Sequence, residues 1–154
     1  MIFAAGLGTR LRPLTDNMPK AMVPVDGTPM LQRVIENLKA HGFHDIIVNV
    51  HHFGEQIIDF LAQNNNFGLN ITVSDERDLL LDTGGGIKAV RHMLDDGEPF
   101  LVHNADILTT LDLTAMYKHH CQSNADATLL VKSRKTERYL LFDNGNRLQG
   151  WINK

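Results

Sequence analysis

The segment Ala4-Ala5-Gly6-Leu7-Gly8-Thr9-Arg10-Leu11-Arg12-Pro13-Leu14-Thr15 follows a short apolar run, Met1-Ile2-Phe3, that is typical of a buried strand. Its two glycines leave the backbone free to turn tightly and to approach a ligand closely. Consecutive N–H groups in such a turn form a concave anion site. Thr9 then supplies a hydroxyl, Arg10 and Arg12 supply guanidinium groups, and Lys20 follows, so bidentate forks and a point charge are both available. The sequence therefore predicts a phosphate-binding loop after the first strand.

Two familiar phosphate-binding motifs do not fit this segment. A Walker loop needs Gly, four residues, Gly-Lys and then Ser or Thr, and no such string occurs. The dinucleotide fingerprint G-x-G-x-x-G also fails, because Leu11 stands where a third glycine would follow Gly6 and Gly8. The acidic residue about 20 positions on, Asp26, precedes a glycine and is typical of a turn. A dehydrogenase domain is thereby disfavoured. A plain turn between strand and helix would explain the glycines but not the cationic residues.

The segment, continued by Pro19-Lys20-Ala21-Met22-Val23-Pro24-Val25, resembles the signature of the sugar-phosphate nucleotidyltransferases. Two later motifs agree with it, Asp82-Thr83-Gly84-Gly85-Gly86 and Leu101-Val102-His103-Asn104-Ala105-Asp106. The resemblance covers nearly the whole chain. The Thr-Gly-Gly-Gly form is most similar to the N-acetylmuramate-1-phosphate uridylyltransferase and mannose-1-phosphate guanylyltransferase branch. The resemblance implies an enzyme that joins an NTP to a sugar 1-phosphate, giving an NDP-sugar and pyrophosphate, with Mg²⁺ as cofactor.

The resemblance also implies roles for individual residues. We expect Arg10, Lys20 and Asp106 to be catalytic, with Asp106 as the Mg²⁺ ligand. Lys20 would contact the α-phosphate or the sugar phosphate, and Asn104 would also bind substrate. Family members commonly have glycine at the position of Ala105, which changes the backbone freedom beside the metal ligand. The residues expected to bind the nucleotide are Ala4, Ala5, Gly6, Gly8, Thr9, Arg10, Thr83, Gly84 and Gly85.

Strand-like runs alternate with helical patterns along most of the chain. Thr28–His41 has apolar residues at helical spacing, with Thr28 and Pro29 suited to the N-cap and first position and Gly42 to the end. The Asp82–Gly86 motif opens a further helix, and its three glycines would leave N–H groups uncovered for a base edge or a phosphate. A flexible turn would explain those glycines equally well. The remaining predicted elements are helices at 55–63 and 112–121 and strands at 46–50, 70–74, 99–103 and 127–131.

This alternation predicts the α/β class, as a Rossmann-like three-layer αβα sandwich with a mostly parallel central sheet. The apolar run Pro99–His103 would be a central strand, and Ala127–Val131 a buried one. Tyr139–Phe142 and Leu148–Trp151 flank an Asn-Gly turn, which predicts a C-terminal β-hairpin.

The bulk composition fits one globular domain. The chain has 154 residues, 43% hydrophobic and 21% charged. Its net charge of −3 argues against nucleic acid as a partner. No apolar run approaches the ~18 residues of a membrane span. Cys121 is the only cysteine, so no disulfide forms within the chain, and we expect a reducing, cytoplasmic location.

Family members are usually longer, with a C-terminal half that completes the sugar pocket and supplies a second metal-binding carboxylate. Asp126 and Asp143 do not fit that pattern. We therefore expect residues 1–154 to be one catalytic domain in truncated form, of which the N-terminal nucleotide-binding portion is present. Unpaired strand edges would favour a homo-oligomer. UTP and then GTP are the preferred nucleotides on resemblance, and a non-catalytic nucleotide- or sugar-phosphate-binding regulatory domain is the alternative.

Overall fold

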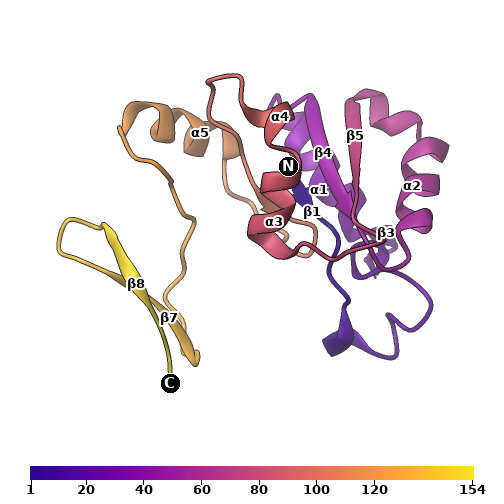
Figure 1. Ribbon diagram of the computed structural model, residues 1–154, viewed down its shortest axis with the longest axis horizontal. Coiled ribbons are helices and arrows are strands. Elements are labelled where there is room, and N and C mark those ends of the chain that lie inside the picture. Colours follow the sequence, from indigo (N-terminus) through magenta and orange to yellow (C-terminus); the bar gives the residue numbers. More distant parts are fainter. The chain divides into compact units, whose positions relative to one another are not determined.

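Four parallel strands form the central sheet, in the order β5-β4-β1-β6 (Figure 1). The computed structural model describes residues 1–154 as two compact units, Met1–Asn124 and Ala125–Lys154, and the sheet belongs to the first. That both units belong to one catalytic domain stays a prediction. The strands of the sheet are β1 (Ile2–Phe3), β4 (Asp45–Val50), β5 (Asn70–Asp75) and β6 (His103–Asn104).

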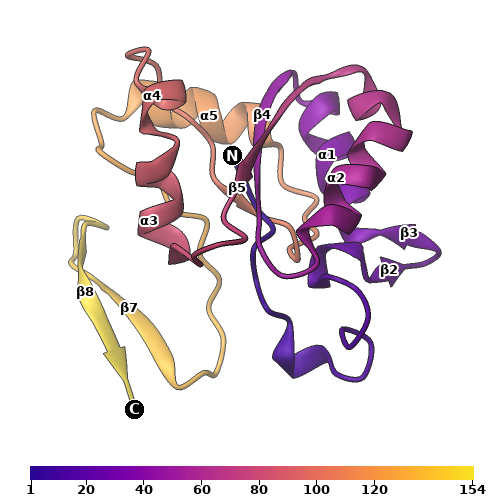
Figure 2. The same ribbon diagram turned by 45° about the vertical axis from the view of Figure 1, so that its right-hand side comes forward.

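Helices cover both faces of this sheet (Figure 2). Side chains alternate between the two faces along each strand, so both faces carry apolar side chains that need covering. On one face Ile2, Val48 and Val50 pack against α1, α2 and α5. On the other face Met1 and Ile47 pack against α3 and α4. The helices are α1 (Met30–Ala40), α2 (Gly54–Gln63), α3 (Asp82–Ala89), α4 (Arg91–Leu94) and α5 (Leu113–Gln122), with short 3-10 turns η1 (Thr9–Leu11), η2 (Lys20–Met22) and η3 (Asn65–Gly68). The three-layer αβα prediction is confirmed.

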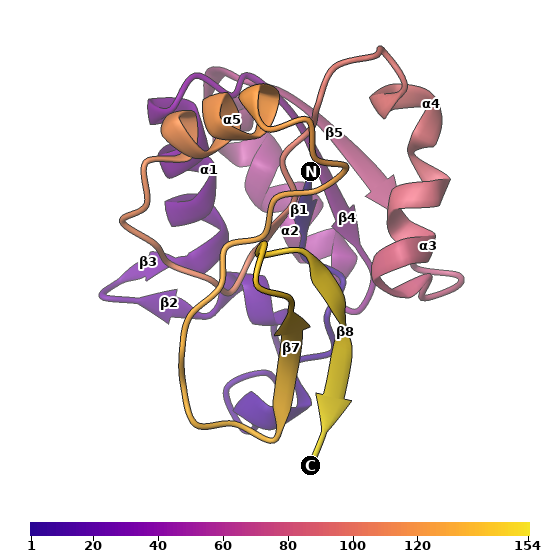
Figure 3. The same ribbon diagram turned by 90° about the vertical axis from the view of Figure 1, so that its left-hand side faces the viewer.

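Two helices lie side by side on the first face, α1 and α5 (Figure 3). The Thr114 hydroxyl donates to the His41 carbonyl oxygen, and Phe43 meets Tyr117 edge to face with ring centroids 5.9 Å apart. The Asp112 carboxylate accepts from the Ala115 N–H at 2.9 Å, which is the N-cap bond that fixes where α5 begins.

The start of α1 corrects the sequence prediction. Thr28 and Pro29 were predicted to cap the helix and to begin it, but they form β3 (Thr28–Pro29), which pairs antiparallel with β2 (Pro24–Val25). The helix begins one residue later, at Met30. The predicted turn at 26–27 has positive φ at both residues, so it closes a hairpin whose second strand takes the two residues that resemble a cap.

The strand before the proposed metal ligand is shorter and less central than its sequence predicts. Pro99–His103 was predicted to be a central strand, but β6 contains only His103–Asn104 and lies at the edge of the sheet, beside β1. Phe100 and Val102 are exposed as a result. An apolar run is buried only where elements cover both its sides, and β6 has a neighbouring strand on one side.

The second unit is an antiparallel hairpin of β7 (Arg138–Phe142) and β8 (Leu148–Asn153). It confirms the prediction made from the Asn-Gly turn. The buried strand predicted at Ala127–Val131 is wrong: these residues form no strand, and Leu129, Leu130 and Val131 are exposed. Nowhere in the chain is a helix both long enough and apolar enough to cross a bilayer.

Candidate functional site

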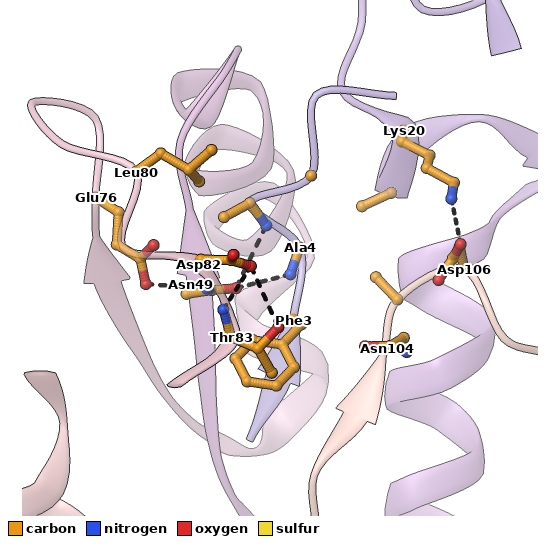
Figure 4. Close-up of a pocket in the computed structure, with 14 residues that line it drawn as sticks. Phe3, Ala4, Lys20, Asn49, Glu76, Leu80, Asp82, Thr83, Asn104 and Asp106 are labelled. Carbon is orange, nitrogen blue, oxygen red and sulfur yellow. Dashed lines mark hydrogen bonds and ion pairs between the residues drawn. The ribbon is translucent and has the colours of Figure 1, made fainter. Parts of the chain in front are cut away.

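A cavity of about 290 Å³ lies at the carboxyl ends of the parallel strands, where open α/β sheets bind their ligands (Figure 4). All four strands of the sheet contribute to it through their last residues or the loops that follow. The lining residues are Phe3, Ala4, Ala5, Gly6, Lys20, Ala21, Asn49, Glu76, Leu80, Asp82, Thr83, Asn104, Ala105 and Asp106.

The three sequence motifs meet at this cavity. Of the predicted site residues, those that line it are Ala4, Ala5, Gly6, Lys20, Thr83, Asn104 and Asp106. Gly8, Thr9 and Arg10 lie further along the loop, at and just before η1, and the Thr9 and Arg10 side chains are exposed. Gly84 and Gly85 lie inside α3 and do not line the cavity.

Lys20 and Asp106 form an ion pair on one side of the cavity, although 86 positions separate them in the sequence. Figure 4 shows the ammonium group and the carboxylate pointing toward one another, with Asn104 beside them. The two side chains keep 24% and 35% of their surface exposed. A solute entering the cavity therefore meets a cation and an anion that are already adjacent.

The glycine-rich loop is held against the same lysine. Gly8 has a φ of +66°, and a Cβ there would lie 2.9 Å from Thr15 Cγ2 and 3.1 Å from Lys20 Cβ. The buried Thr15 hydroxyl donates to the Gly8 carbonyl oxygen at 2.9 Å. Glycine is therefore required at position 8 both for its backbone conformation and for this close approach.

The second motif opens α3, as the sequence predicts. The helix begins at Asp82, so Thr83, Gly84 and Gly85 lie in its first turn, and their role in nucleotide binding stays a prediction. Gly86 is buried, and a Cβ there would lie 2.9 Å from Glu76 Oε1. Just before the helix the Leu81 N–H donates to Glu76, and in its first turn the Thr83 N–H donates to the Asp82 carboxylate at 2.8 Å.

Sequence reasoning missed two polar residues beneath the cavity, Asn49 and Glu76, which are 2% and 3% exposed. Asn49 Oδ1 accepts from the Ala4 and Ala5 N–H groups at 2.8 and 3.3 Å, and its Nδ2 donates to Glu76 Oε1 at 2.9 Å. A signal was present: asparagine is depleted in strands, yet Asn49 lies among β-branched residues in a buried one. A buried amide needs partners, so its position alone pointed to a polar network.

The family assignment rests on a match over most of the chain. The nucleotidyl transferase family model matches residues 1–142. This protein is a member of the nucleotidyl transferase family. The match includes the glycine-rich loop, the Asp82–Gly86 motif and Asp106, the three stretches on which the resemblance in the sequence rests.

The relatives of this family member are named for several different substrates. It is 43% identical over 118 residues to the N-acetylmuramate alpha-1-phosphate uridylyltransferase of Neisseria meningitidis, covering 77% of this chain and 51% of the relative. It is 37% identical over 144 residues to the UTP–glucose-1-phosphate uridylyltransferase of Synechocystis, covering 86% and 37%. The chain thus spans about half or less of the length of these curated relatives.

A solved structure matches the fold of this family member over almost its entire length. The crystal structure of HddC from Yersinia pseudotuberculosis, complexed with GMP-PN, aligns with a TM-score of 0.78 at 29% identity. The alignment covers 99% of this chain and 68% of that one.

Proposed function

We propose that this protein transfers a nucleotidyl group from an NTP to a sugar 1-phosphate. A phosphate oxygen of the sugar 1-phosphate would bond to the α-phosphorus while the bond from that phosphorus to the β-phosphate's bridging oxygen breaks. Pyrophosphate would leave with the electron pair, and an NDP-sugar would remain. The observation that supports this best is the meeting of the glycine-rich loop, Lys20 and Asp106 at one cavity.

The nucleophile needs no general base in this proposal. The second pKa of a phosphate monoester is about 6, so the sugar phosphate is largely dianionic at neutral pH. The obstacle is bringing two anions together and stabilising the charge that gathers on the α-phosphorus. Positioning and electrostatic stabilisation by this chain's residues would therefore supply most of the rate enhancement.

The cationic groups would have separate tasks. Arg10, exposed in η1, would bind the triphosphate with its bidentate fork. Lys20 would contact the α-phosphate or the sugar phosphate, and Asn104 would help to hold that substrate from the neighbouring position. The backbone from Gly6 to Thr9 would bind phosphate oxygens, since Ala4 and Ala5 already donate their N–H groups to Asn49.

The residues at the cavity fit Mg²⁺. This ion is usually bound through one or two carboxylates together with substrate phosphates and waters, so a single carboxylate beside a triphosphate site suffices. Asp106 would hold it, and we find no cluster of three or more His, Cys, Asp or Glu that could hold a metal without substrate. When bound, Mg²⁺ supplies charge neutralisation on the phosphate oxygens. Lys20 pairs with Asp106, so its ammonium group already lies beside the carboxylate that would hold the ion.

The nucleotide base would lie near Thr83, Gly84 and Gly85 at the start of α3. UTP and GTP are the candidates, because relatives include uridylyltransferases and guanyltransferases and the HddC structure contains GMP-PN. UTP is the first choice, since the uridylyltransferase of Neisseria meningitidis is 43% identical. A cytoplasmic location and a homo-oligomer stay predictions.

Pyrophosphate release tests the proposal. The longest native form of the protein would be incubated with Mg²⁺, each NTP in turn and a panel of sugar 1-phosphates. We expect release with one NTP and one sugar, and none when either is omitted. Measurable NTP binding without release from any pair would contradict the transferase and support the non-catalytic nucleotide-binding domain instead.

A further inference from the structure

A buried polar connection runs beneath the cavity and joins segments that are distant in the sequence. Asn49, near the end of β4, accepts from the Ala4 and Ala5 N–H groups and donates to Glu76 Oε1. Glu76 Oε2 in turn accepts from the Leu81 N–H at 3.3 Å, just before α3. We call these two side chains the Asn49–Glu76 bridge. Figure 4 shows it between Ala4 and the loop that carries Leu80.

The bridge is buried and closely surrounded. Its two residues are almost fully buried, and a Cβ on Gly86 would lie 3.3 Å from Asn49 Nδ2 as well as 2.9 Å from Glu76 Oε1. The Glu76 backbone is fixed too, since its N–H donates to the Val50 carbonyl oxygen at 2.8 Å and its carbonyl oxygen contacts His51 Nδ1 at 2.6 Å. The carboxylate therefore has little freedom to move away from Asn49.

The bridge also divides the N–H groups of the first loop into two sets. The groups of Ala4 and Ala5 point inward to Asn49, where strand pairing of β1 has ended. No atom of the chain accepts from the N–H groups of Gly6 and Leu7, so these remain for an anion. Fixing the first pair anchors the chain directly before the second pair, and so limits the positions that the Gly6 and Leu7 N–H groups can take.

We propose that Asn49 and Glu76 are positioning residues for the nucleotide. By holding Ala4–Ala5 and Leu81 through one connection, the bridge fixes the phosphate-binding loop relative to the start of α3, where the base would lie. A nucleotide spans those two segments, so its affinity depends on their relative placement. The inference rests on the proposed function. It assigns neither residue a contact with the reacting atoms.

The pattern of donors and acceptors predicts which substitutions break the bridge and which restore it. In Glu76→Gln one acceptor becomes a donor, so either Asn49 Nδ2 or the Leu81 N–H loses its acceptor. In Asn49→Asp two carboxylates face each other across the present 2.9 Å contact. The double variant Asn49→Asp/Glu76→Gln exchanges the roles. The new aspartate accepts from Ala4, Ala5 and the new amide, whose oxygen still accepts from Leu81.

The test measures nucleotide affinity and backbone protection together. UTP and GTP binding with Mg²⁺ would be measured by calorimetry, and hydrogen exchange by mass spectrometry on peptides covering residues 1–10 and 76–90. We expect each single variant to lose about tenfold or more in affinity, with faster exchange in both peptides. The double variant should recover most of both. Asp112→Ala is the control, because it removes the α5 cap and a contact with His41, both away from the bridge, and should leave affinity unchanged.

Several results would overturn the inference. Single variants that bind the nucleotide as tightly as wild type, even if less stable, would show a merely structural bridge. A folded double variant with no recovery would show that donor–acceptor matching is not what matters. If Asn49→Asp does not fold, the milder Glu76→Gln carries the comparison. Wild-type protein that binds neither nucleotide would overturn the proposed function together with this inference, whereas unaffected variants overturn the inference alone.

Discussion

Gly86→Ala is the substitution that tests the packing beneath the cavity most sharply. The added Cβ would lie 2.9 Å from Glu76 Oε1, 3.3 Å from Asn49 Nδ2 and 3.4 Å from Phe3 Cε1. Carbon–oxygen contacts of 2.9 Å are too close to persist, so either α3 shifts or the carboxylate leaves Asn49. Gly84 provides a matched control in the same helix, because a Cβ there would have nothing within 4 Å.

The two substitutions should change stability in opposite directions. Alanine is favoured over glycine in a helix by about 1 kcal/mol, a gain that both variants share. At Gly86 that gain is opposed by overpacking, or by leaving a buried polar group without its partner, each costing about 1–3 kcal/mol. We therefore expect Gly86→Ala to lower the free energy of unfolding by about 1 kcal/mol and Gly84→Ala to raise it by about 0.5–1 kcal/mol.

Urea unfolding followed by the helical circular dichroism signal is a suitable assay. All five α-helices lie in the unit Met1–Asn124, so the signal reports on the part of the chain that contains Gly84 and Gly86. The difference between the variants should be about 2 kcal/mol in the free energy of unfolding. Equal stabilisation by both substitutions would refute the reasoning, because it would mean that the carboxylate is free to move out of the way.

Four further variants address the site and its surroundings. Asp106→Asn should lower Mg²⁺-dependent turnover at least about a hundredfold. It should change the free energy of unfolding by about 1 kcal/mol or less, because the ion pair of Asp106 with Lys20 is partly exposed. Near-normal pyrophosphate release would show that Asp106 is not the metal ligand. Arg10→Ala should weaken NTP binding about ten- to a hundredfold in calorimetry, through loss of a charged phosphate contact. The Arg12 side chain pairs with Asp16, so Arg12→Ala should weaken NTP binding less than Arg10→Ala does. Equal losses of NTP affinity in the two variants would contradict the role of Arg10. Asp112→Ala should cost about 1 kcal/mol in chemical unfolding by removing the α5 N-cap, and a stability equal to wild type would show that the cap contributes nothing.

Periodic burial was the part of the fold that the sequence encodes most directly. Leu31, Val34, Ile35 and Leu38 are all buried, as their helical spacing predicts. A local pattern suffices here, because one face of the helix meets the sheet whatever the neighbouring elements are. The same holds for the hairpin turn, which depends on residues adjacent in the chain.

The errors concern features that depend on partners. Pro99–His103 and Ala127–Val131 have the composition of buried strands, but composition does not specify which strand lies alongside. Thr28 and Pro29 suit a helix cap and also suit the second strand of a hairpin, and pairing with Pro24–Val25 decided between the two. Local propensity was outweighed by tertiary contacts in each case.

The candidate site also combines features that local sequence predicts with features that depend on tertiary partners. The loop, Lys20 and Asp106 belong to recognisable motifs, and their convergence follows from the geometry of a parallel sheet. Glu76 belongs to no motif used here, and its importance arises only from the partners that folding brings to it, Asn49 and Leu81. A sequence indicates that a buried polar residue needs a partner without naming which one.

The most direct test of the central claim follows the phosphorus atoms of the NTP. The native protein would be incubated with Mg²⁺, a sugar 1-phosphate and NTP labelled at either the α- or the γ-phosphate. Nucleotidyl transfer predicts that the α label enters the NDP-sugar and that the γ label leaves in pyrophosphate. A γ label found on the sugar, or released as inorganic phosphate, would contradict attack at the α-phosphorus.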